Sequence, residues 1–121
     1  MSYERFHKTF VGVFKHWESV PWPVVHNQVC YEKNGYCITF FYTRFFNHRI
    51  NSAHFQIINS LKRPLINVPF QEYIKTRPFE NDLLLIRSAI EDPRNAPILM
   101  GRPLYINLME DLLNKSATVS V

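Results

Sequence analysis

The sequence predicts a single α+β domain with an N-terminal helix, a three-stranded antiparallel β-meander and two C-terminal helices. Three observations lead to this prediction. Apolar residues recur at helical steps near the N-terminus, three short segments rich in β-branched and aromatic residues follow, and two amphipathic segments bounded by prolines complete the chain. A chain of 121 residues is long enough to bury a core without metals or disulfides. We expect residues 1–115 to form the domain and residues 116–121 a flexible C-terminal tail.

The first helix is predicted from about Tyr3 to Trp17, with Ser2 as its capping residue. Apolar side chains within it recur every three or four residues and form one stripe: Tyr3, Phe6, Phe10, Val13, Phe14 and Trp17. Pro21 and Pro23 cannot continue a helix, so they end this element.

The meander is predicted from three short segments, VVHNQVCYE, YCITFFYTRFF and INSAHFQIIN. The dipeptide Asn34-Gly35 lies between the first two segments, and Asn-Gly is the strongest short signal for a β-hairpin. Prolines recur in residues 61–78, so this segment reads as a long connection with room for one short strand at Leu65–Val68.

Two helices are predicted in the C-terminal part of the chain. The first runs from about Phe79 to Glu91, with Glu80 and Asp82 at its start, where the helix dipole favours acidic residues. The second follows a proline-bounded loop, and it has Pro103 near its first turn and an apolar side: Tyr105, Leu108 and Leu112.

Because side chains alternate across a strand, the hairpin register sorts them onto two faces of the sheet. A tight turn places a consistently apolar set on one face, which we expect the first helix to cover: Val25, Val29, Tyr31, Ile38, Phe40, Tyr42, Ala53, Phe55 and Ile57. The opposite face mixes rings with hydroxyl, amide and imidazole groups. Either the last two helices cover this second face, or it is open to a partner.

Positive charge is concentrated in the first half of the chain. Residues 1–63 carry eight Lys and Arg against three Glu, whereas residues 64–121 carry six basic and seven acidic residues. We expect an acidic partner to contact the N-terminal half.

These features favour a non-catalytic protein-interaction module, the subunit or adaptor of a larger assembly, because aromatic and Arg side chains dominate interface energetics. A protein partner is expected, and a homo-oligomer is left open. The predicted binding residues combine rings, cations and polar groups: Phe41, Arg44, Phe45, Arg49, His54, Gln56, Lys62 and Arg63.

The first alternative is an RNA or single-stranded nucleic-acid binding protein, in which rings on the sheet stack on bases and the flanking Arg and Lys contact phosphates. The helix–three strands–helix order resembles that of double-stranded-RNA-binding domains in topology. The helix at Phe79 nevertheless begins with acidic residues where that family has a lysine cluster.

The second alternative is a small cleft enzyme that uses His26 and His54. No nucleophile motif or phosphate-binding loop is present in the sequence. Four residues of a strand span about 13 Å, so His26 and Cys30 cannot share one ion, and we expect no metal or cofactor. Two cysteines without a secretory signal predict free thiols in the cytoplasm or nucleus, and no apolar run is long enough for a membrane span.

Overall fold

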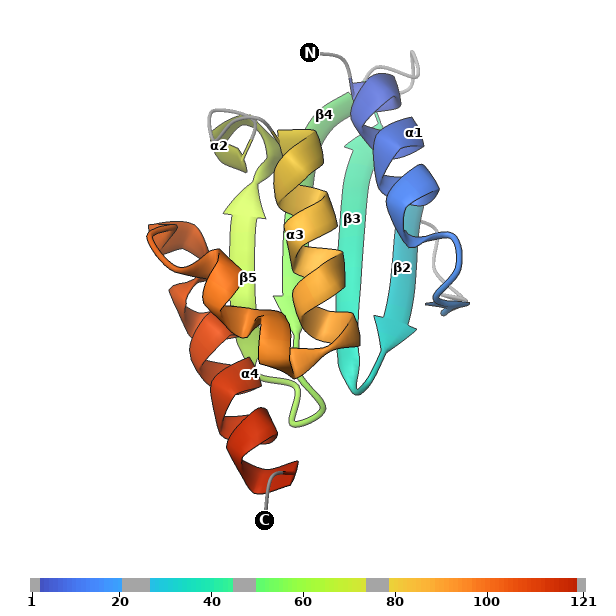
Figure 1. Ribbon diagram of the computed structural model, residues 1–121. Coiled ribbons are helices and arrows are strands. Elements are labelled where there is room, and N and C mark those ends of the chain that lie inside the picture. The colour runs from blue at the N-terminus through green and yellow to red at the C-terminus, as the bar shows by residue number, and fades with distance from the viewer. Residues whose placement is uncertain (1–2, 21–26, 45–49, 74–78, 120–121) are drawn as a thin grey trace.

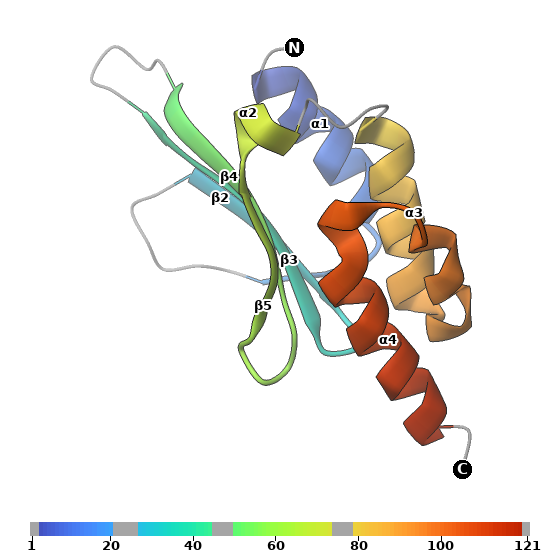
Figure 2. The same ribbon diagram turned by 90° about the vertical axis from the view of Figure 1, so that its left-hand side faces the viewer.

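The computed structural model describes residues 3–20, 27–44, 50–73 and 79–119 of the chain. In chain order the elements are α1 (Tyr3–Phe14), β1 (Glu18–Ser19), β2 (Asn27–Lys33), β3 (Tyr36–Arg44), β4 (Ile50–Ile58), β5 (Pro64–Pro69), α2 (Phe70–Tyr73), α3 (Phe79–Glu91), the 3₁₀ helices η1 (Pro93–Leu99) and η2 (Pro103–Tyr105), and α4 (Ile106–Val119). The five strands form one antiparallel sheet in chain order (Figure 1). Figure 2 shows that α1, α3 and α4 all lie on the same side of this sheet.

The predicted α+β class is confirmed, but the three-stranded meander is wrong, because the sheet in the described part has five strands and the α-helices number four. The short strand expected at Leu65–Val68 is part of β5, which pairs with β4. Strand β1 has two residues and α2 only four, so neither is long enough to show a periodic pattern. The loop expected before the last helix contains η1 instead.

The ends of the helices agree with the sequence in one case and differ in two. Helix α3 spans Phe79–Glu91, as predicted. Helix α1 ends at Phe14, and a turn then brings the Trp17 amide to the Phe14 carbonyl at 2.9 Å. Helix α4 continues to Val119, which lies within the segment for which a tail was expected.

The Asn34-Gly35 dipeptide forms the predicted hairpin turn between β2 and β3. Both residues have positive φ, 53° and 88°, which suits the two-residue turns that match the twist of a sheet. Lys33 therefore pairs with Tyr36, and Val29 pairs with Phe40. This register gives the predicted sorting of side chains into two faces.

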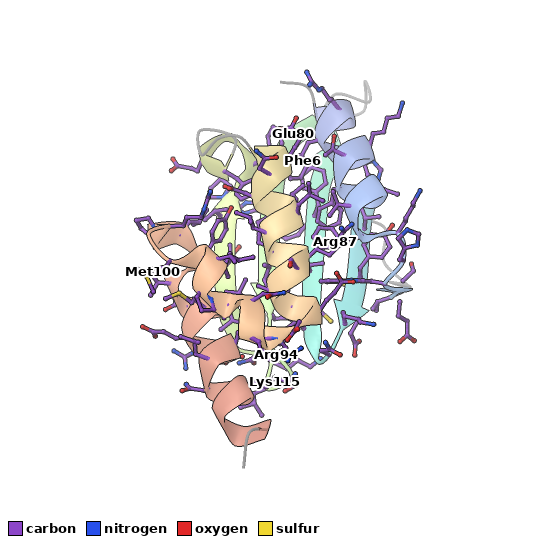
Figure 3. All side chains as sticks on the ribbon, viewed as in Figure 1. Phe6, Glu80, Arg87, Arg94, Met100 and Lys115 are labelled. Carbon is purple, nitrogen blue, oxygen red and sulfur yellow. The ribbon has the colours of Figure 1, made fainter. Side chains whose placement is uncertain are left out.

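The core lies between the sheet and the helices and is dominated by rings. Phe6 of α1 contacts Phe40 of β3 at a centroid distance of 4.7 Å, and Phe10 lies 6.3 Å from Phe55 of β4. In Figure 3, Phe6 points into the space between α1, α3 and the sheet. The apolar face predicted for β2, β3 and β4 is confirmed for its buried members: Tyr31, Ile38, Phe40, Phe55 and Ile57. Val25 and the side chains of Tyr42 and Ala53 lie outside the described residues.

Polar contacts join α1 to α3 at the edge of this core. The Arg87 guanidinium of α3 donates to the Val13 carbonyl at 3.1 Å and lies 3.5 Å from the Glu91 carboxylate (Figure 3). The Trp17 indole also approaches Glu91, at 3.4 Å. These contacts satisfy a carbonyl near the end of α1 that has no partner within the helix.

No helix in the described segments is long and apolar enough to span a membrane.

We predict that Phe40→Ala lowers the free energy of unfolding by about 3 to 5 kcal/mol, because a fully buried ring is replaced by a cavity. Chemical denaturation of both proteins measures the loss. Leu61→Ala is the control, since this side chain is 84% exposed and its removal should change stability by less than about 0.5 kcal/mol. A loss below about 1 kcal/mol for Phe40→Ala would contradict the assignment of faces.

A substitution at Gly12, in the interior of α1, is predicted to stabilise the fold rather than destabilise it. A Cβ added at Gly12 would meet nothing within 4 Å, so Gly12→Ala should raise the free energy of unfolding by about 0.5 to 1 kcal/mol. The matched control is Gly35→Ala, which should destabilise the fold by more than that, because Gly35 has φ of 88° and its Cβ would lie 3.4 Å from that of Ser60. Equal effects at both positions would refute this account.

Candidate functional site

The side of the sheet that faces away from α1, α3 and α4 is covered by none of these helices and is called the open face (Figure 2), although Cys30 and Thr39 on it are buried. The strand register arranges its residues in successive rows across the strands. Phe41 pairs with His54 in one row, and the next row contains Cys30, Thr39, Gln56 and Asn67. The row nearest the Asn34-Gly35 turn contains Glu18, Glu32, Cys37 and Ile58. The alternative in which the last two helices cover this face is therefore wrong.

The Phe41–His54 pair is the aromatic feature of the open face. The two rings stack across β3 and β4 with centroids 5.2 Å apart and planes within 9°. Both side chains are half-buried, as is Gln56, which follows His54 on the same face. The pair is thus a flat platform held by two strands of the sheet. Such a platform can contact another ring, a guanidinium group or an apolar side chain.

The two cysteines lie diagonally to each other on the open face, and both are free thiols. The Thr39 hydroxyl donates to the buried Cys30 sulfur at 3.2 Å. Burial, together with the nearby Cys30 and Glu32, raises the pKa of the Cys37 thiol to about 11, although the Lys62 ammonium acts to lower it. Cys37 is therefore protonated at neutral pH and is a poor nucleophile there.

Only part of the predicted binding set is brought together. Phe41, His54 and Gln56 are neighbours on the open face. Lys62 and Arg63 are exposed in the β4–β5 turn, which follows the end of β4, and the four residue steps from His54 to Ile58 span about 13 Å of that strand. Phe45 and Arg49 lie outside the described residues, as does the side chain of Arg44, the last residue of β3.

The residues described here contain no group of three or more His, Cys, Asp and Glu side chains that is placed to hold a metal ion. His26, one of the two histidines of the enzyme alternative, lies outside the described residues. His54, the other, stacks on Phe41.

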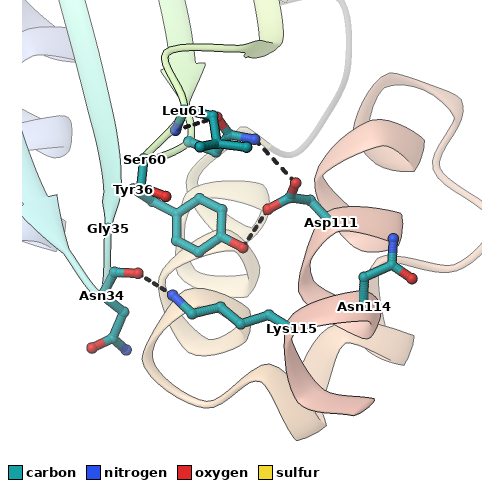
Figure 4. A pocket seen from close by; sticks show the side chains of 9 residues that line it. Asn34, Gly35, Tyr36, Ser60, Leu61, Asp111, Asn114 and Lys115 are labelled. Carbon is teal, nitrogen blue, oxygen red and sulfur yellow. Dashed lines mark hydrogen bonds between the residues drawn. The ribbon is translucent and has the colours of Figure 1, made fainter. Parts of the chain in front are cut away.

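A pocket of about 300 Å³, which is absent from the sequence-based predictions, lies at the turn end of the sheet (Figure 4). Three elements form this turn pocket: the β2–β3 turn, the β4–β5 turn and α4. Most of the residues that line it carry a polar side chain: Asn34, Gly35, Tyr36, Asn59, Ser60, Leu61, Asp111, Asn114 and Lys115. The spacing of Asp111 and Lys115, one helical turn apart, was the signal available in the sequence.

The polar groups of the turn pocket bind one another. Tyr36 donates to one oxygen of Asp111 at 2.6 Å, and the Asn59 amide donates to the other at 3.1 Å. Lys115 donates to the Asn34 carbonyl and lies over the Tyr36 ring, 4.8 Å from its centroid. These contacts fasten α4 to both turns, so we assign the pocket a structural role.

A second polar cluster, which no sequence pattern indicated, surrounds the buried carboxylate of Asp82 and includes the partly exposed side chain of Arg102. Asp82 of α3 is 1% exposed and accepts hydrogen bonds from Arg102 and, at 3.0 Å, from the Tyr105 hydroxyl. The hydroxyls of Tyr105 and Tyr73 lie 3.1 Å apart. The Asp82 carboxylate is thus ion-paired and hydrogen-bonded, as a buried charge requires. Through these contacts the cluster joins α3 to η2 and α2.

The Tyr36–Asp111 contact predicts a pH dependence of stability. Burial and the adjacent carboxylate raise the pKa of Tyr36 in the folded protein. Stability gained from the neutral phenol is therefore complete below about pH 10 and is lost as the pH rises above that value.

Tyr36→Phe should lower the free energy of unfolding by about 1 kcal/mol at neutral pH, and the variant should lose less stability than the wild type between about pH 9 and 11. Urea unfolding across this range measures both slopes. Because Tyr73 and Tyr105 are retained in both proteins, the difference reports Tyr36 alone. Parallel slopes would contradict the assignment.

No family model, curated protein or solved structure matches this chain to a significant degree.

Proposed function

We propose that this chain is a non-catalytic protein-interaction module, a subunit or adaptor of a larger assembly, which docks a protein partner on its open face. One observation supports this proposal above the others. All three long helices pack on one side of the sheet, which leaves the half-buried Phe41–His54 stack on the side without a helix. A rigid ring surface with few rotatable bonds binds at a low entropic cost.

A protein partner fits the open face better than nucleic acid does. Base stacking on a sheet works together with cations that contact the phosphates close by. Where the structure describes its side chains, the rows of this face contain the exposed acids Glu18 and Glu32 and no Lys or Arg. Lys62 and Arg63 lie beyond the far end of β4. This distribution favours a partner that buries apolar and polar atoms.

The non-catalytic part of the proposal is supported by the chemistry of the polar groups. A nucleophile needs a lowered pKa or an adjacent base, and the pKa of Cys37 is raised instead. Asp82 has no access to solvent, and Asp111 is held by two donors. Free thiols are in keeping with the cytoplasm or nucleus that we infer for this protein.

Phe41→Ala should weaken partner binding by at least about tenfold, because truncating a central ring at an interface removes a dominant contact. The tagged protein is first used to capture partners from a lysate with and without nuclease. The amount of each captured protein is then measured over a dilution series of the wild type and of the variant, which gives the two binding strengths. Met100→Ala is the matched control, since Met100 is 70% exposed and lies away from the open face (Figure 3).

Two results would overturn the proposal. Nuclease treatment could abolish capture, which would identify nucleic acid as the partner. Alternatively, Phe41→Ala could capture the same proteins at the same strength while its thermal unfolding is unchanged, which would exclude the open face.

A further inference from the structure

We propose that the outward side of α1 is a second docking surface, and that its partner is an acidic amphipathic helix. This inference goes beyond the open face, because α1 lies on the opposite side of the sheet (Figure 2). A module that binds on both sides would connect two proteins.

The surface is a basic stripe made by Arg5, Lys8 and Lys15. These residues and Gly12 are separated by three, four and three positions, which places them on one side of a helix. All four are exposed. The opposite side of α1 contains fully buried rings of the core, and this packing keeps the basic stripe on the outside of the molecule.

Two of the three cations of the basic stripe form no ion pair within the described residues. Arg5 lies 3.8 Å from Glu80 of α3, but its side chain is 69% exposed, so this ion pair is weak. Lys8 and Lys15 have no ion-pair partner among the residues that the structure describes. By contrast, each described arginine of the C-terminal half is paired with a carboxylate: Arg87 with Glu91, Arg94 with Asp92 and Arg102 with Asp82 (Figure 3 labels Arg87 and Arg94).

Gly12 lies within the basic stripe and has no role in packing the fold. It is exposed, and a Cβ there would meet no atom within 4 Å. A glycine inside a helix destabilises it relative to alanine, so the position carries a cost that no contact with the described residues explains. The absent side chain allows another helix to approach the backbone of α1 closely, since the distance between packed helices depends on the residues at the contact.

The lysines of the basic stripe and the glycine between them indicate what kind of partner fits this surface. Lys8 lies in α1 and Lys15 directly follows Phe14, the last residue of α1, so the two lysines are about two helical turns apart, a spacing that suits acidic residues repeated every seven positions on an opposing helix. A membrane-surface helix would need exposed apolar residues beside its cations, whereas the apolar side of α1 is in the core. A surface that binds the phosphate backbone of a nucleic acid would bind more tightly with a lysine or an arginine in place of Gly12.

The test uses the full chain and a fluorescein-labelled helical peptide with glutamates seven residues apart and alanine between them on the same side. Fluorescence anisotropy measures its binding at low and at physiological salt. We expect binding that weakens with salt, and losses of about tenfold for Lys8→Glu and for Lys15→Glu. Gly12→Leu should also weaken binding several-fold, because its side chain would hold the peptide away from the backbone.

The controls separate this surface from the rest of the molecule. Lys33→Glu changes an exposed lysine outside the basic stripe and should leave peptide binding unchanged. Phe41→Ala should also leave it unchanged, so a failure of this inference and a failure of the open face are distinguishable. Circular dichroism and thermal unfolding verify that each variant is folded.

Four results would overturn the inference. A peptide of the same composition with its glutamates scrambled around the helix could bind equally well. A single-stranded oligonucleotide, or vesicles that contain phosphatidylserine, could bind more tightly than the peptide and depend on the same lysines. Binding could also be unaffected by Gly12→Leu.

Discussion

The Asn34-Gly35 turn is the constraint on which the rest of the structure depends. Its two positive φ angles fix a two-residue loop, and that loop pairs Lys33 with Tyr36. A shift of one residue in this register would move every side chain of β3 to the other face of the sheet. The turn also holds the helices, because the Asn34 side chain donates to the Ile90 carbonyl of α3 at 2.9 Å and its own carbonyl accepts from Lys115 of α4.

Features set by local sequence could be predicted, whereas those that need a distant partner could not. The periodicity of Phe79–Glu91 and the alternation along β3 are properties of short segments, and both are found in the structure. Strand β1 exists because Glu18 and Ser19 meet β2, and no pattern within two residues can indicate that. Helices α1, α3 and α4 lie on the same side because all three pack their apolar residues against one face of the sheet. No single segment can indicate that arrangement.

The same distinction applies to the candidate site. Phe41 and His54 were grouped because both follow from the register that the Asn34-Gly35 turn sets. Lys62 and Arg63 were grouped with them through net charge alone, and charge gives no position within a sheet. The turn pocket was missed because Tyr36 and Asp111 are 75 residues apart in the chain. Only the docking of α4 brings them together.

The placement of prolines in β5 has a consequence for self-association. This strand is at the end of the sheet, where unpaired amides and carbonyls could template a strand of another molecule. Pro64 and Pro69 bound β5 and contribute no amide hydrogen at either end. Fewer backbone amides of this edge are therefore available to pair with a strand of another molecule, as fibril growth requires. The sheet can present its face to a different protein while its β5 border resists stacking with identical copies.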